Sequence, residues 1–133
     1  MAYTVNAVVT YQFSFEDFTF TYYLDSAVTA ADVGKAMTLD TTGTNKMKLA
    51  GAGDAIHGRL ETFEDRTQEG IKVGAVSRHF RSKLPTTGAV ALGANLIGSA
   101  TPGVAAAGAV PAGEGRNYVV EVGSGYAIVE KFS

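Results

Sequence analysis

Aromatic residues alternate with polar ones along the first part of the chain. From Val9 to Phe15 the apolar residues occupy odd positions, whereas from Phe18 to Tyr22 they occupy even positions. A period of two is typical of β-strands, and the phase reversal at Glu16–Asp17 predicts a turn or a bulge between two strands. We therefore expect residues 1–25 to form an aromatic β-arm or hairpin.

The remainder of the chain alternates in short stretches that are separated by glycine-rich turns. One helical turn is expected at 29–36, with Thr29 as N-cap and Asp32 three residues later. A charged loop is expected at 64–70, and Gly123 and Gly125 favour a hairpin near the end of the chain. Strands are expected at 36–39, 46–49, 56–63, 71–81 (one long strand or two short ones, closed by Pro85), 89–92, 95–97, 117–121 and 126–131.

This pattern predicts an all-β fold, because it contains many short strands and almost no helical periodicity. We expect a small β-barrel or β-sandwich with short strands, Gly-rich turns and an extended N-terminal arm. Residues 26–133 are predicted to form a single β-barrel-like domain. The length of 133 residues is enough for one domain with its own core.

Composition excludes several classes of protein. The chain has no cysteine, so it has neither a disulfide framework nor a thiolate metal site. Its 11 basic and 13 acidic residues give a net charge of −2, from which no general affinity for nucleic acid follows. The first residues do not resemble a signal peptide, and the uncharged stretch 84–113 is too rich in Gly and Ala for a bilayer helix. A cytoplasmic setting, or a particle assembled in the cytoplasm, is expected.

Catalytic and metal-binding patterns are weak. His57 and His79 lie 22 residues apart with no third ligand at close spacing, so we interpret both as structural. Ser77 shares a strand face with His79, but no nucleophile turn or paired acid accompanies them. Glu61, Glu64 and Asp65 neighbour arginines, which favours ion pairing over hydrolysis. We therefore expect no enzyme activity, no cofactor and no metal.

Charge is unevenly distributed along the chain. Residues 1–45 carry a net charge of −4, residues 46–83 carry +3 and residues 84–133 carry −1. Complementary surfaces, within a subunit or between neighbours, would explain this asymmetry, and so would ordinary solvated faces. Acidic residues interrupt the basic ones, which makes single-strand nucleic-acid binding a poor interpretation. The candidate interface arginines are Arg59, Arg66, Arg78 and Arg81.

Tyr11, Phe13 and Phe15 are the candidate anchors of the N-terminal arm. Aromatic anchors are favoured at protein interfaces, and strand addition to a neighbour's sheet edge would supply backbone hydrogen bonds. Two interpretations stay open: aromatic residues of this segment fill the core of the subunit, or they dock on another subunit. The phase reversal favours docking, because one core cannot cover both faces.

Three stretches resemble the head decoration (cement) proteins of tailed bacteriophages. They are residues 26–39, residues 88–97 with 101–104, and the closing hairpin at 118–123 and 128–130. The resemblance implies a structural virion protein without catalytic residues. It would bind the outer surface of an expanded icosahedral capsid after assembly in the host cytoplasm, often as a homotrimer, and clamp adjacent major capsid subunits.

The resemblance implies two partners, the major capsid protein and the protein itself, and neither nucleic acid nor membrane. Several modest contacts per oligomer would combine into a large joint affinity. Two alternatives remain at this stage. One is another phage structural β-module, associated with a tail tube or a fibre. The other is a glycan-binding β-domain in which tyrosines of the N-terminal segment stack on sugars.

Overall fold

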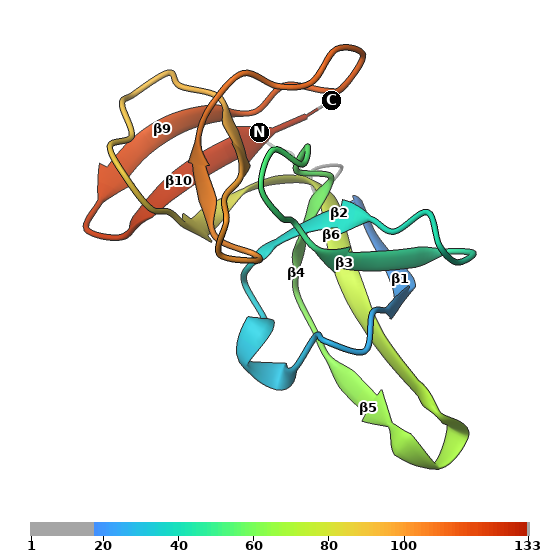
Figure 1. Cartoon of the computed structure of the whole chain (residues 1–133). Coiled ribbons are helices and arrows are strands. Elements are labelled where there is room, and N and C mark those ends of the chain that lie inside the picture. Colours follow the sequence, from blue (N-terminus) through green and yellow to red (C-terminus); the bar gives the residue numbers. More distant parts are fainter. Residues whose placement is uncertain (1–17, 133) are drawn as a thin grey trace, which may run out of the picture.

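The computed structural model describes residues 18–132, and these are almost entirely strands and turns (Figure 1). The predicted all-β class is confirmed. Two 3-10 turns, η2 (Ala30–Asp32) and η3 (Thr67–Glu69), interrupt the strands. The strands are β1 (Phe18–Leu24), β2 (Ala36–Leu39), β3 (Lys46–Leu49), β4 (Gly58–Leu60), β5 (Glu64–Arg66), β6 (Ile71–Pro85), β7 (Leu96–Gly98), β8 (Ala105–Ala107), β9 (Tyr118–Gly123) and β10 (Tyr126–Lys131).

Five strands close into a barrel, which decides between the two predicted architectures. They pair in the order β1–β3–β2–β4–β6, and β6 returns to pair with β1. The β1–β3 pair is parallel and has only two residue pairs, whereas the other pairs are antiparallel. The barrel encloses the buried side chains of Tyr22, Leu24, Val28, Met37, Met47, Leu60 and Val76.

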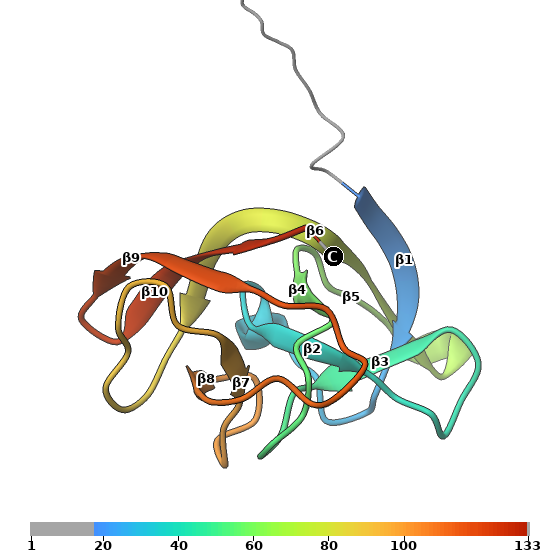
Figure 2. The same ribbon diagram turned by 90° about the horizontal axis from the view of Figure 1, so that it is seen from above.

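β6 continues beyond the barrel and forms the base of a second lobe. Its 15 residues make one long strand, which arches over the molecule in Figure 2. β1 pairs with β6 as far as His79, and β10 pairs with β6 from Phe80 onwards. The two strands therefore follow one another along β6. β9 pairs with the far side of β10.

A second core lies under the β6–β10–β9 sheet, beside the β7–β8 hairpin. Its buried side chains come from β2, β6, β7, β8, β9 and β10 and from the connection between β3 and β4. The same face of β6 lines both cores, because Val76 lies in the barrel and Phe80 and Leu84 lie in the second core. The second core contains Ala36, Ala50, Ile56, Phe80, Leu84, Leu96, Ala105, Val119, Ala127 and Val129.

Several strand boundaries differ from the sequence prediction. The predicted loop at 64–70 contains β5, whose three exposed charged residues pair with β6. Residues 89–92 form no strand, since a turn at Leu92–Gly93 breaks the segment, and Leu92 is 69% exposed. The predicted strand 56–63 is reduced to β4, and β8 was not predicted. β5 and β8 form although their residues do not alternate between apolar and polar, because each pairs with an adjacent strand.

Only the second of the two strands predicted for the N-terminal arm lies within the described residues. Residues 9–15, with the predicted first strand of the arm, lie outside the described residues. The second predicted strand is β1, which belongs to the barrel and pairs with β6 over most of its length. The predicted turn after Thr29 is also present, and the Asp32 carboxylate accepts the Thr29 backbone N–H at 2.8 Å.

Candidate interaction surfaces

All four candidate arginines form contacts within the subunit, and two of them donate to backbone carbonyls. Arg59 of β4 donates to the Lys83 carbonyl at 2.8 Å and to a Glu61 carboxylate oxygen at 2.7 Å. Arg78 of β6 donates to the His57 carbonyl at 2.8 Å and to the Tyr22 hydroxyl at 3.0 Å. Both guanidinium groups therefore connect separate segments of the fold. An interface role for either arginine would be additional to this structural role.

The other two arginines are exposed and lie on different elements. Arg66 is on β5, where its Nε donates to Glu64 at 2.9 Å. Arg81 is on β6 and pairs with Glu130 of β10 at 3.0 Å. The four candidate arginines thus do not converge on one patch. The three predicted anchors, Tyr11, Phe13 and Phe15, lie outside the described residues.

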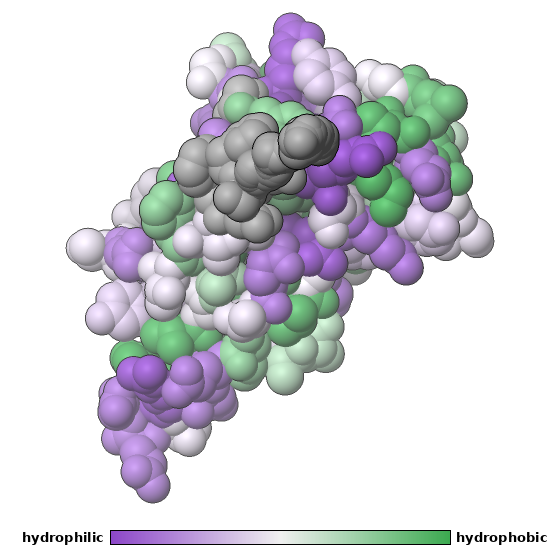
Figure 3. Space-filling view, turned by 180° about the vertical axis from the view of Figure 1, so that it is seen from behind, coloured by the Kyte–Doolittle hydropathy of each residue, from purple (hydrophilic) through white to green (hydrophobic). Residues whose placement is uncertain are grey.

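The first candidate surface is the outer face of the β6–β10–β9 sheet, which we call the outer sheet face. The strand registers place three rows of side chains on the face opposite the second core. Tyr118 is 46% exposed and Ile128 is half-buried. In Figure 3 apolar side chains gather on the lobe that carries β9 and β10. The rows are Arg81–Glu130–Tyr118, Lys83–Ile128–Glu121 and Pro85–Tyr126–Gly123.

Charged side chains surround the apolar part of the outer sheet face. The Lys83 ammonium lies over the Tyr126 ring, 4.3 Å from its centroid, and Arg81 pairs with Glu130. Glu121 is exposed on the edge strand. An apolar and aromatic centre with a charged rim is the usual composition of a protein–protein interface. The sequence pattern predicts the β9–β10 hairpin but not this face, because the face depends on the pairing of β10 with β6.

The second candidate surface is the projecting hairpin formed by β5, η3 and the start of β6. It extends away from the barrel in Figure 1, and residues 64–70 are all exposed. Gly70 ends η3 with φ of 73°, in the left-handed region that glycine adopts readily. The hairpin therefore presents charged side chains well away from both cores.

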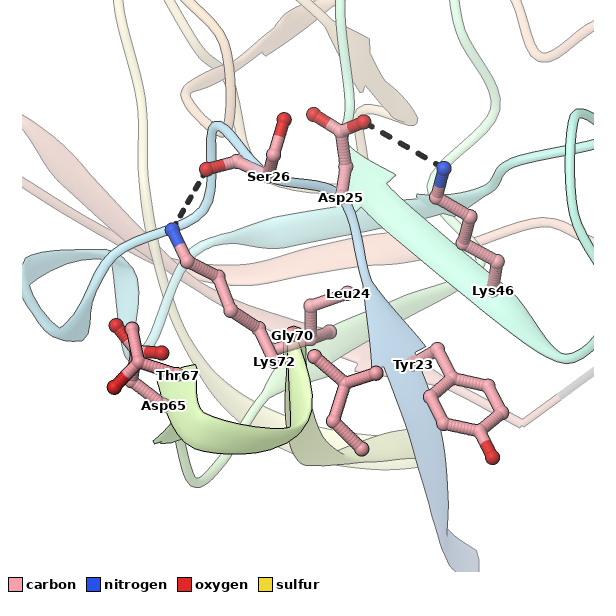
Figure 4. A pocket seen from close by; sticks show the side chains of 10 residues that line it. Tyr23, Leu24, Asp25, Ser26, Lys46, Asp65, Thr67, Gly70 and Lys72 are labelled. Carbon is pink, nitrogen blue, oxygen red and sulfur yellow. Dashed lines mark hydrogen bonds and ion pairs between the residues drawn. The ribbon is translucent and has the colours of Figure 1, made fainter.

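The third candidate surface is a cleft of about 470 Å³ between the projecting hairpin and the ends of β1 and β3. Figure 4 shows Leu24 between Tyr23 on one side and Lys72, Thr67 and Asp65 on the other. Tyr23 is 47% exposed. Asp25, Ser26 and Lys46 complete the polar rim. No residue of this cleft was singled out as a site residue from the sequence, because the hairpin that forms one wall was predicted as a loop.

Lys46 and Lys72 hold the cleft together. The Lys72 ammonium donates to the carbonyls of Ser26 and Val28, at 2.7 Å each. The Lys46 ammonium lies 3.8 Å from Asp25 and 3.5 Å from the buried Asp40. These contacts join the projecting hairpin, the β1–η2 connection and β3, so the shape of the cleft is fixed by the fold.

His57 belongs to a polar junction between the barrel and the second lobe. The Leu39 N–H donates to Nδ1 at 3.0 Å, which leaves Nε2 to donate to Glu114 at 2.8 Å. Burial lowers the pKa of the nearby Lys131, and the neighbouring Arg78 charge adds to this effect. Within residues 18–132, no group of three or more His, Asp or Glu side chains is placed to hold a metal ion.

Over the same range, no helix has the length and apolar character needed to cross a membrane. Comparison with known proteins found no matching family model, no matching curated protein and no matching solved structure.

Proposed function

We propose that this protein is a head decoration (cement) protein of a tailed bacteriophage. It binds the outer surface of the expanded capsid, as a homotrimer, and clamps adjacent major capsid subunits. The observation that carries the proposal is the outer sheet face, where Ile128 lies in the central row and two tyrosines and several charged residues lie around it. The resemblance of three sequence stretches to cement proteins supplies the identity of the partner.

The outer sheet face is suited to a protein partner rather than a small substrate. Tyr118 and Ile128 offer apolar area on rigid strands, which lowers the entropic cost of binding. Aromatic side chains are prominent among the residues that dominate interface energies. Arg81, Lys83, Glu121 and Glu130 provide charges of both signs at the rim, which favour one orientation of the partner.

A clamp needs more than one contact per subunit, and the fold provides two separated surfaces. The outer sheet face lies on the second lobe, whereas the projecting hairpin extends from the barrel. Subunits in a trimer would multiply these contacts. Because linked contacts act at high effective concentration, individually weak contacts are enough to hold the protein on the shell. Expansion of the capsid would bring the complementary sites to the required spacing.

Co-sedimentation with expanded, undecorated capsids tests the proposal. The native protein is expected to bind, and Tyr118→Ala is expected to weaken binding about tenfold or more, since loss of an anchoring aromatic costs on the order of 1–2 kcal/mol. Leu39→Ser is the control, because Leu39 is 40% exposed on β2, away from the outer sheet face.

Absence of binding by the native protein would refute the capsid assignment. Equal binding by the native protein and Tyr118→Ala would remove the outer sheet face from the interface. Rings or tubes formed by the purified protein alone would instead favour a tail-tube module.

A further inference from the structure

The cleft beside the projecting hairpin has the chemistry of a small-ligand site. Its volume of about 470 Å³ lies within the range of ligand pockets. It is lined by both apolar and polar side chains, which come from the β1 end, the β3 start and the projecting hairpin. We propose that this cleft binds one ring of a neutral sugar, as part of a glycan.

The apolar part of the cleft fits the C–H face of a sugar ring. Tyr23 is 47% exposed and forms one wall, and Leu24 and Ile71 also line the cleft (Figure 4). A tyrosine ring provides a flat apolar surface together with a polar hydroxyl group. Gly70 adds no side chain to the opposite wall, and the space where its Cβ would stand is open.

The charges of the cleft favour a neutral ligand. Asp25 and Asp65 carry negative charges and Lys46 and Lys72 carry positive ones, so these four side chains sum to zero. A phosphate or a carboxylate therefore gains no net attraction from them. Sugar hydroxyls both donate and accept hydrogen bonds, so a single sugar ring matches carboxylate acceptors and ammonium or hydroxyl donors together.

The polar rim is held in place before any ligand binds. Lys72 is fixed by two backbone carbonyls at 2.7 Å, and Lys46 lies between two carboxylates. Asp25 also accepts the Ala27 N–H at 3.1 Å, which orients its carboxylate. Groups that are already ordered lose little entropy on binding. This low entropic cost is important for a polar ligand that binds weakly.

Sugar binding at this cleft does not involve the outer sheet face, although the projecting hairpin, which the proposed clamp also uses, forms one wall of the cleft. Tyr23 lies on the barrel, whereas Tyr118 lies on the second lobe. If both proposals hold, many copies on one particle would each offer a weak sugar site, and multivalency would raise the avidity of the particle for a glycan-coated surface.

Titration of the full-length ¹⁵N-labelled protein with glucose, galactose and N-acetylglucosamine, at millimolar concentrations, tests the site directly. We expect amide shifts at 23–26, 46 and 65–72 for at least one sugar. Tyr23→Ala is expected to weaken that sugar's binding about fivefold or more, as expected for loss of an aromatic contact. Tyr23→Phe should retain binding because the ring remains.

Tyr118→Ala is the matched control, because Tyr118 is 46% exposed and distant in the fold from the cleft. It should leave sugar binding unchanged while weakening capsid binding, and Tyr23→Ala should do the reverse. No response to the three sugars, together with no signal on a broad glycan array, would overturn the assignment. Loss of capsid binding in Tyr23→Ala without any sugar response would assign the cleft to a protein partner instead.

Discussion

At the scale of single residues, Asn117 shows how one side chain substitutes for a missing strand. It is 1% exposed, and its amide donates to the Leu96 carbonyl at 3.0 Å and accepts the Leu96 N–H at 2.7 Å. Asn117→Ala leaves both backbone groups buried without this partner. We expect it to lower the free energy of unfolding by about 2–4 kcal/mol, because each unsatisfied buried group costs about 1–3 kcal/mol.

Urea denaturation followed by circular dichroism measures this loss. Thr87→Ala serves as the control, because Thr87 is exposed in the same lobe and a surface change of this kind shifts stability by less than about 0.5 kcal/mol. A stability of Asn117→Ala equal to that of the control would show that the amide pairing contributes nothing.

Two aspartates are expected to make the free energy of unfolding depend on pH in the acid range. Burial raises the pKa of Asp32, but hydrogen bonds from Thr29 and Lys35 outweigh it, so the pKa is lowered. The hydroxyl and the N–H of Thr42 lower the pKa of Asp40. Both pKa values are lower in the folded state than in the unfolded state. Their stabilisation is therefore present above the unfolded pKa of about 4 and is lost as the pH falls through the folded pKa.

We expect the free energy of unfolding to decrease as the pH falls below about 4, the usual aspartate pKa. Asp40→Asn should flatten this decrease, because it removes one of the two aspartates whose pKa is lowered in the folded state. Urea titrations between pH 7 and pH 2.5 provide the comparison. A slope in Asp40→Asn identical to that of the native protein would contradict the assignment of Asp40.

At the scale of elements, the sequence pattern predicts strands well where apolar and polar residues alternate on both sides of a short turn. The predicted bounds of β2 and β3 are those observed, because these strands pair with each other across a short turn. The β9–β10 hairpin is also found, for the same reason. β8 was missed because its Ala105–Ala107 sequence has little strand preference and depends on pairing with β7.

The candidate sites were less predictable than the strands. Arg59 and Arg78 could be recognised as basic residues, but their partners include the carbonyls of Lys83 and His57, which only the folded chain brings near. Tyr23 lies within the predicted N-terminal arm of residues 1–25, yet it forms a wall of a cleft. Surfaces that combine side chains from non-neighbouring strands leave no local pattern in a sequence.

At the scale of the whole molecule, β6 connects the two cores. It contributes Val76 to the barrel and Leu84 to the second core without a break. Gly98 of β7 strengthens the connection, because its N–H donates to the Asp54 carbonyl at 2.9 Å. Neither core can therefore lose its packing without disturbing a strand that the other requires.

We predict a single unfolding transition in which mutations in either core have the same kind of effect. Met37→Ala in the barrel and Leu84→Ala in the second lobe should each lower the free energy of unfolding by about 2–5 kcal/mol, since both side chains are fully buried. Both should shift one common transition in scanning calorimetry, with equal calorimetric and van't Hoff enthalpies. Two separated transitions, each sensitive to only one of the variants, would mean that the barrel and the second lobe unfold independently despite sharing β6.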